Sequence, residues 1–240
     1  MSVQHQPLAV LAIGAHPDDV EIGCAGTLAR CIRRGDRVTI AILCQGDTAS
    51  ADMPAEELVA LRRQEAKEAA GYLGTELIQL DLSDYGVQVD LATKRLLAGV
   101  IRRARPDVVI THFHADYGSD HNHTCLLAVD ATLAASVPAF AAEGEPLAGV
   151  PALFMMEPLG GYGFQPQVYV DITETIETKI AMFERHRSQV EWMKRHGGTD
   201  MREYITAIAR FRGLQCGVRY AEGFIGHPSW GHVTAGRLLP

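Results

Sequence analysis

Short apolar runs alternate with amphipathic segments along the first half of the chain. Apolar runs at 8–14, 38–44, 77–82 and 108–113 each have the length of one buried strand. Helices are predicted between and after them by their apolar spacing and their Gly or Pro end signals, at about 21–34, 54–74, 91–104 and 124–135. Strands that alternate with helices of this length indicate a parallel sheet with right-handed crossovers. We therefore expect an α/β fold, a Rossmann-like three-layer sandwich with a mostly parallel sheet.

The pattern is less regular after residue 136. Strands are predicted near 152–156 and 168–170, and helices near 174–195 and 201–211. Neither an internal repeat nor a long linker separates this part from the first half. We therefore interpret residues 1–240 as a single domain whose N-terminal Rossmann-like part covers about 1–136.

Composition narrows the classes of protein. Hydrophobic residues make up 47% and charged residues 21%, which is ordinary for a globular fold with a sizeable core. Lys and Arg total 22 against 29 Asp and Glu, a formal net charge of −7, which disfavours broad contact with nucleic acid or anionic lipid. Apolar runs stay well short of the ~18 residues of a membrane span. Five cysteines without a Cys-x-x-Cys pair favour reduced thiols and a cytoplasmic location.

A His-Pro-Asp-Asp motif follows the first predicted strand and contains His16, Asp18 and Asp19. In a parallel sheet, side chains just beyond the carboxyl ends of the strands face the ligand crevice. Two adjacent carboxylates beside an imidazole are costly to crowd together without a cation. An aspartate pair that caps the next helix is the alternative. On this motif alone, a metal site and a helix cap both remain open.

A second cluster follows the fourth predicted strand, where residues 112–123 contain four histidines and two aspartates. For His112 and His114 we favour an ordinary role at the end of a strand. If the strands have the order 3-2-1-4, strands one and four are neighbours, and both clusters line one crevice. Two imidazoles and one carboxylate that leave positions open are typical of catalytic zinc. We select His16, Asp19 and His121 as ligands, which leaves Asp18 as a base.

Five sequence blocks, spread over nearly the whole chain, carry a resemblance to one enzyme family. They are GAHPDDVEIG at 14–23, LRRQEAK at 61–67, DYGSDH at 116–121, QPQVYVDI at 165–172 and GVRYAEGF at 217–224. With them the chain resembles the PIG-L/LmbE-like family of metal-dependent N-deacetylases. It is most similar to the bacillithiol-pathway branch, which acts on N-acetylglucosaminyl conjugates.

That resemblance implies roles for single residues. His16 and Asp19 match the metal ligands of the family's first motif, and Asp18 matches its general base. His121 matches the last histidine of the family's His-Pro-Asp-His motif, the third ligand. Arg62 matches an arginine near the pocket mouth, which implies a substrate contact; a solvated charge on a helix is the alternative. The resemblance also implies a homo-oligomer, with a hexamer as one form.

The chain departs from the family at one informative position. Where relatives read His-Pro-Asp-His, this sequence reads Gly-Ser-Asp-His, with Gly118 in place of the first histidine. The family assigns that histidine to transition-state stabilisation or to protonation of the leaving group. Here the role is vacant or filled from elsewhere, and Tyr117 and His123 are nearby candidates.

These observations predict a zinc-dependent hydrolase that removes an N-acetyl group from an amino-sugar (N-acetylglucosaminyl) conjugate. Fe²⁺ or Co²⁺ is compatible with the same ligands. A metal-dependent amidase acting on another small-molecule amide is one alternative, and a catalytically silent metal- or sugar-binding relative is another. A nucleotide-dependent oxidoreductase or transferase is disfavoured, because no Gly-x-Gly-x-x-Gly follows the first predicted strand.

Overall fold

The computed structural model of the chain describes residues 6–228. Its strands are β1 (Ala9–Gly14), β2 (Arg37–Cys44), β3 (Glu76–Leu82), β4 (Val108–Thr111), β5 (Ala152–Met156), β6 (Val168–Asp171) and β7 (Ala221–His227). Its helices are α1 (Asp19–Arg34), α2 (Ala55–Leu73), α3 (Leu91–Ala104), α4 (Ser119–Ala135), α5 (Ile176–Phe183), α6 (Arg187–Gly197) and α7 (Met201–Cys216). The strands form one sheet in the order β3-β2-β1-β4-β5-β7-β6.

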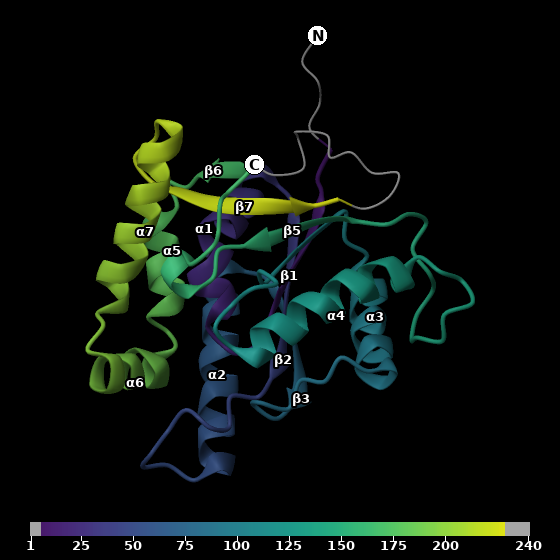
Figure 1. Cartoon of the computed structure of the whole chain (residues 1–240), viewed down its shortest axis with the longest axis horizontal. Coiled ribbons are helices and arrows are strands. Elements are labelled where there is room, and N and C mark those ends of the chain that lie inside the picture. The colour runs from purple at the N-terminus through teal and green to yellow at the C-terminus, as the bar shows by residue number, and fades with distance from the viewer. Residues whose placement is uncertain (1–5, 229–240) are drawn as a thin grey trace.

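The sheet confirms the predicted α/β fold and the predicted order of its first four strands. Strands β3, β2, β1, β4 and β5 pair in parallel, and β7 runs antiparallel between β5 and β6. Helices α3 and α4 lie on one side of the sheet, and α1, α2, α5 and α7 lie on the other (Figure 1). The result is a three-layer sandwich with a mostly parallel sheet.

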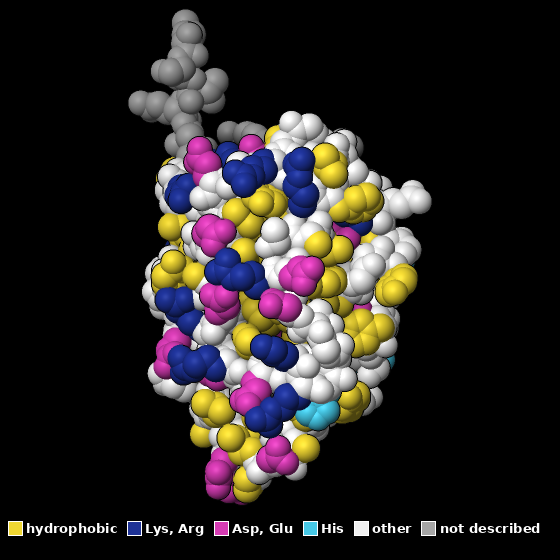
Figure 2. All heavy atoms as spheres, turned by 90° about the vertical axis from the view of Figure 1, so that its left-hand side faces the viewer, with side chains coloured by type: hydrophobic (Ala, Val, Ile, Leu, Met, Phe, Trp, Pro, Cys, Tyr) yellow, Lys and Arg dark blue, Asp and Glu magenta, His cyan; other side chains and the backbone are white. Residues whose placement is uncertain are grey.

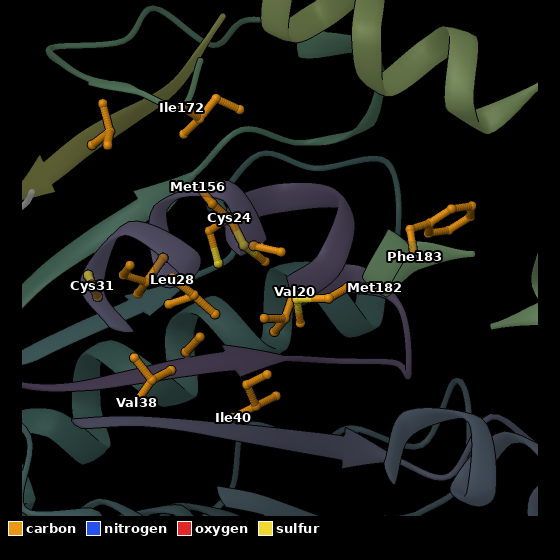
Figure 3. Packing of buried hydrophobic residues seen from close by; sticks show 14 of the residues in the cluster. Val20, Cys24, Leu28, Cys31, Val38, Ile40, Met156, Ile172, Met182 and Phe183 are labelled. Atoms are coloured by element: carbon orange, nitrogen blue, oxygen red, sulfur yellow. The ribbon is translucent and has the colours of Figure 1, made fainter. Parts of the chain in front are cut away.

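Each face of the sheet has its own hydrophobic core, because successive side chains of a strand point to opposite faces. In β1, Val10 and Ala12 belong to the core under α1 and α5, whereas Leu11 and Ile13 belong to the core under α3 and α4. Val20 and other apolar side chains of α1 extend toward β2 and β5 in Figure 3. Burial on both faces explains why these strands read as continuous apolar runs rather than alternating ones.

Two glycines of α1 let that helix approach its neighbours closely. A Cβ at Gly23 would lie 2.4 Å from the Met156 sulfur, and one at Gly26 would lie 2.9 Å from Ile172. Any larger side chain would push α1 away from β5 and from the end of β6. The close packing fixes the start of α1, which carries part of the candidate site.

Three parts of the fold differ from the sequence prediction. The helix predicted over 174–195 is broken into α5 and α6, and α4 begins at Ser119 rather than at 124. The polar run at 119–123 has no apolar periodicity, so the pattern did not indicate its first turn. Strand β7 was not predicted, because two glycines and a glutamate weaken its strand pattern.

Three observations bear on the class of protein. No helix within residues 6–228 is long and apolar enough to cross a membrane. On the face shown in Figure 2, Lys and Arg side chains are interspersed with Asp and Glu. All five cysteines are free thiols, in line with the reduced thiols predicted: Cys24, Cys31, Cys44, Cys125 and Cys216.

Candidate metal and catalytic site

A cavity of about 460 Å³ opens at the carboxyl ends of the parallel strands. Its floor combines His16, Asp18 and Asp19, which follow β1, with Asp120 and His121, which begin α4 after β4. Strands β1 and β4 pair directly, so the two clusters meet although they are about 100 residues apart in the sequence. The strand order thus brings together the side chains that the sequence prediction combined.

Three of these side chains form a compact triangle. His16 Nδ1 lies 3.2 Å from His121 Nε2. Asp19 Oδ2 lies 3.5 Å from His16 Nδ1, and the other oxygen of the same carboxylate, Oδ1, lies 3.4 Å from His121 Nε2. A tetrahedral zinc ion with bonds of about 2.0–2.1 Å holds its ligand atoms about 3.3–3.4 Å apart. The residues that the sequence selected as ligands therefore have donor types and a spacing compatible with a bound metal ion.

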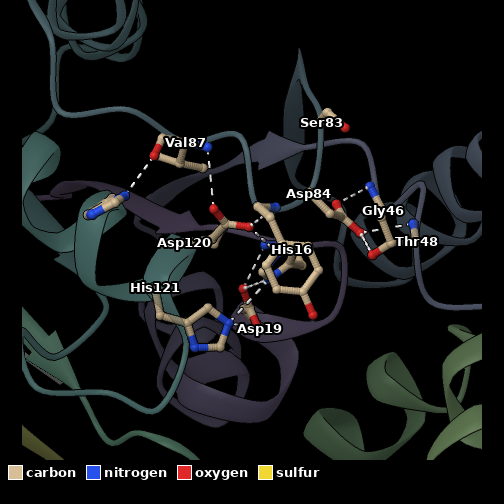
Figure 4. A network of polar contacts seen from close by, with 12 residues as sticks. His16, Asp19, Gly46, Thr48, Ser83, Asp84, Val87, Asp120 and His121 are labelled. Atoms are coloured by element: carbon tan, nitrogen blue, oxygen red, sulfur yellow. Dashed lines mark hydrogen bonds and ion pairs between the residues drawn. The ribbon is translucent and has the colours of Figure 1, made fainter.

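A carboxylate contacts the outer nitrogen of each imidazole in the triangle. His16 Nε2 lies 3.1 Å from Asp120 Oδ2, and His121 Nδ1 lies 2.9 Å from Asp116 Oδ2. Figure 4 shows Asp120 between His16 and the backbone of Val87, whose N–H donates to it at 3.3 Å. Such partners hold the outer nitrogen protonated and leave the inner lone pair free for a metal. The sequence block contained both aspartates, but their roles were not predicted.

Charge favours a cation at the centre of the triangle. Burial alone would lower the pKa of both imidazoles, but hydrogen bonds and charges of neighbouring aspartates raise the pKa of His16 and of His121. Burial alone would raise the pKa of Asp19, but the charges of His121 and His112 hold it well below its usual range. The carboxylates therefore attract positive charge, which either protons or a metal ion can supply.

We expect Asp116→Asn to weaken metal binding by about 10- to 100-fold, the usual effect of losing a carboxylate partner of a ligand histidine. The change keeps the side-chain size but removes the charge beside His121 Nδ1. Competition with a chromophoric chelator measures the affinity. Asp81→Asn is the matched control, because Asp81 is an exposed partner of Arg63 outside the cavity. Equal affinities in the two variants would contradict the role assigned to Asp116.

His112 is part of this site, which corrects the expectation of an ordinary strand-end residue. Its ring is buried and stacks on that of His121, with centroids 4.3 Å apart and an interplanar angle of 14°. The Ala15 N–H donates to its Nε2 at 2.9 Å, which ties the end of β4 to the loop after β1. Burial lowers its pKa. His114, by contrast, is exposed, as expected of a strand-end residue.

Asp18 lies beside the triangle rather than in it. Its backbone has a φ of 118°, a strained conformation for a non-glycine residue, and its side chain is buried. Among the described residues its carboxylate accepts no bond from the first N–H groups of α1, so the alternative of a helix cap is wrong for Asp18. Burial raises its pKa to about 6, against the opposing charge of Arg62. Such a carboxyl is suited to take up and return a proton near neutral pH.

Arg62 is buried behind Asp18, so the alternative of a solvated helix charge is wrong. It is 2% exposed, its Nη2 donates to the Pro17 carbonyl at 2.7 Å, and the same atom lies 3.8 Å from Asp18 Oδ1. Gly46 makes room for it, because a Cβ there would lie 2.6 Å from the guanidinium. The geometry suits a residue that positions Asp18, and a direct substrate contact of Arg62 stays a prediction.

Position 118, where relatives have a histidine and this chain has a glycine, faces the cavity. Gly118 directly precedes α4, and a Cβ there would meet the His121 ring at an ordinary 3.7 Å. Of the two candidates for its role, His123 lies about 200° around the helix from His121 and its Nδ1 donates to the Val87 carbonyl at 2.7 Å. Tyr117 lines the cavity, with its ring edge-on to His121 at 5.3 Å. The geometry therefore favours Tyr117 over His123.

Both the sequence and the fold of this chain are similar to those of known proteins. The family model described as "PIG-L: GlcNAc-PI de-N-acetylase" matches residues 11–132. Diacetylchitobiose deacetylase of Thermococcus kodakarensis is 30% identical over 89% of this chain and 81% of its own length. A 4-oxalmesaconate hydratase of Pseudomonas putida is 27% identical over 90% of this chain and 87% of its own. The solved structure of a conserved Thermus thermophilus protein is 33% identical, covers 94% of this chain and 100% of its own, and has a TM-score of 0.80.

Proposed function

Because this chain belongs to the PIG-L (GlcNAc-PI de-N-acetylase) family, we propose that it is a metal-dependent hydrolase that removes the N-acetyl group of an amino-sugar substrate. The observation that carries the proposal is the triangle of His16, Asp19 and His121, with the buried carboxyl of Asp18 beside it. A hydrolase needs both parts, an electrophilic centre and a base that is not itself a ligand.

The reaction consumes one water molecule and converts the amide to acetate and a free amine. When bound, a divalent metal would act as a Lewis acid on the amide carbonyl and make water a stronger acid. Asp18 accepts the proton of the attacking water and returns a proton to the amine nitrogen as the C–N bond breaks. In this proposal Arg62 holds Asp18 in place, and Tyr117, which lines the cavity beside His121, is the candidate donor of a hydrogen bond to the developing oxyanion.

We propose zinc as the metal, because two imidazoles and one carboxylate form a preferred zinc set, with Fe²⁺ or Co²⁺ as alternatives. The relative that acts on diacetylchitobiose supports a sugar substrate. The bacillithiol-pathway branch and a homo-oligomeric assembly stay predictions. Because one relative is a hydratase, hydration of 4-oxalmesaconate is the reaction to be excluded.

The test is the release of free amine from N,N′-diacetylchitobiose by the metal-reconstituted protein, followed with fluorescamine. Acetate measured in the same samples should match the amine in amount, because one amide bond yields one of each. Protein treated with a chelator is the control and should release neither product. No amine from any N-acetylated amino sugar would overturn the proposal, and hydration of 4-oxalmesaconate would favour the hydratase instead.

A further inference from the structure

Beyond Asp18, the cavity is lined by parts of the chain that the proposed chemistry does not use. Trp192 lines it from α6, and Tyr85 lines it from the turn after β3. Helix α6 lies at the lower left of Figure 1, at the end of the molecule where β2 and β3 lead into their loops. The proposed metal chemistry does not explain why these two aromatic side chains line the cavity.

The Trp192 ring packs against a side chain of its own helix. It is half-buried and stacks on the His196 ring one helical turn later, with centroids 3.6 Å apart and an interplanar angle of 29°. The start of α6 is anchored on α2, because the Ser188 N–H and hydroxyl both donate to the buried Glu65 carboxylate, at 2.9 and 2.6 Å. The cavity wall that Trp192 forms is thus a preorganised surface, which reduces the entropy lost on binding.

Tyr85 is held at the cavity by a strained turn. Its φ is 59°, an outlier for a bulky residue, and the residue is 78% exposed. The Gly86 N–H closes the turn onto the Ser83 carbonyl at 3.0 Å, and the Tyr85 N–H donates to Asp120 at 2.5 Å. Strain of this kind is often found at binding sites. Here the strained turn places an aromatic ring at the cavity, where it is exposed to solvent and is not stabilised by burial.

Outside the metal triangle, the cavity offers little positive charge to an anionic ligand. Its walls carry the carboxylates of Asp18, Asp19, Asp84 and Asp120. Among the cavity-lining residues that the structure describes, Arg62 is the one Lys or Arg, and it is buried against the Pro17 carbonyl. A phosphate or carboxylate near Trp192 would therefore meet no Lys or Arg of the cavity lining to replace its hydration, whereas an uncharged sugar ring needs no such partner.

We propose that Trp192 and Tyr85 form a subsite for a second, uncharged sugar ring attached to the N-acetylated sugar that reacts. A pyranose presents C–H groups on its faces and hydroxyls at its edges, so stacking on an aromatic ring buries apolar area while the hydroxyls stay hydrated. The inference rests on the proposed function, because the N-acetyl group of the reacting sugar would lie at the metal triangle. A subsite of this kind would favour neutral disaccharides over anionic conjugates as substrates.

The test compares kcat/KM for three substrates: N,N′-diacetylchitobiose, N-acetylglucosamine and N-acetylglucosamine 1-phosphate. We expect the wild type to prefer the disaccharide over the phosphate. In Trp192→Ala, the preference for the disaccharide over N-acetylglucosamine should fall about tenfold, within the range for loss of an aromatic stacking partner. Trp192→Phe should restore most of that preference. Phe211→Ala, which truncates an exposed aromatic ring on α7 outside the cavity, is the matched control.

Binding of the disaccharide to metal-free protein, measured by calorimetry, separates this inference from the proposed function. If no substrate is deacetylated but Trp192→Ala still weakens disaccharide binding about tenfold, the proposed function fails and the subsite stands. If deacetylation occurs with the same substrate preference in wild type and Trp192→Ala, the subsite is wrong. A wild-type preference for the phosphate would overturn it as well.

Discussion

Replacing His121 by alanine is expected to remove most of the bound metal and to abolish measurable deacetylation. His121 supplies one of the three donor atoms of the triangle, and alanine leaves His16 and Asp19 alone to hold the ion. Two protein ligands fall short of the three that a catalytic zinc site uses. The measurement is metal content per chain by elemental analysis after dialysis, together with turnover of diacetylchitobiose.

The neighbouring histidine of the same helix is a sharp control. His123 lies two residues after His121, but its Nδ1 donates to the Val87 carbonyl and its ring does not line the cavity within the described chain. His123→Ala should therefore keep its metal. Full occupancy in His121→Ala would remove that residue from the ligand set, and loss of metal in His123→Ala would move the assignment to His123.

The position of the site could be predicted from the sequence because it depends on strand order. Apolar runs identified β1 and β4, and neighbouring parallel strands place the residues that follow them at one edge of the sheet. Side-chain types then indicated metal chemistry. That reasoning works where a position depends on regular elements, and it placed His16, Asp19 and His121 within reach of one another.

The supporting residues could not be predicted, because their roles depend on contacts between distant loops. The burial of Arg62 depends on a loop glycine, Gly46, that leaves room for the guanidinium. The role of His112 depends on how its ring packs on His121 and on the Ala15 N–H. A sequence pattern shows that such residues are polar, but it does not show which of them the fold buries.

The position of Trp192 at the cavity could not be predicted for a related reason. Trp192 lines the cavity from α6, which is a separate helix because the helix predicted over 174–195 is interrupted at 184–186. The first turn of α6 is held by Glu65, which belongs to α2. The apolar pattern predicted that Glu65 is helical, but it did not predict this contact. Apolar periodicity predicts that a segment is helical, but it does not predict where the helix turns.

Replacing Asp18 by asparagine is expected to lower kcat at least about 100-fold while leaving the metal bound. Asparagine keeps the size of the side chain and tolerates the left-handed backbone conformation at this position. It removes the carboxylate that would take the proton of the attacking water, and general acid–base catalysis contributes about 10²- to 10⁴-fold. The measurement is kcat and KM on diacetylchitobiose at equal metal content.

The matching substitution of Asp19 separates the role of a metal ligand from that of a base. Asp19 contributes oxygens to the triangle and accepts the His16 N–H at 2.6 Å, so Asp19→Asn should lose metal affinity as well as turnover. Asp18 contacts Arg62 instead, and Arg62 keeps its bond to the Pro17 carbonyl when Asp18 is neutral, so Asp18→Asn should retain the fold. Equal metal loss in both variants would show that Asp18 is a ligand. Undiminished turnover in metal-loaded Asp18→Asn would show that Asp18 is not the base.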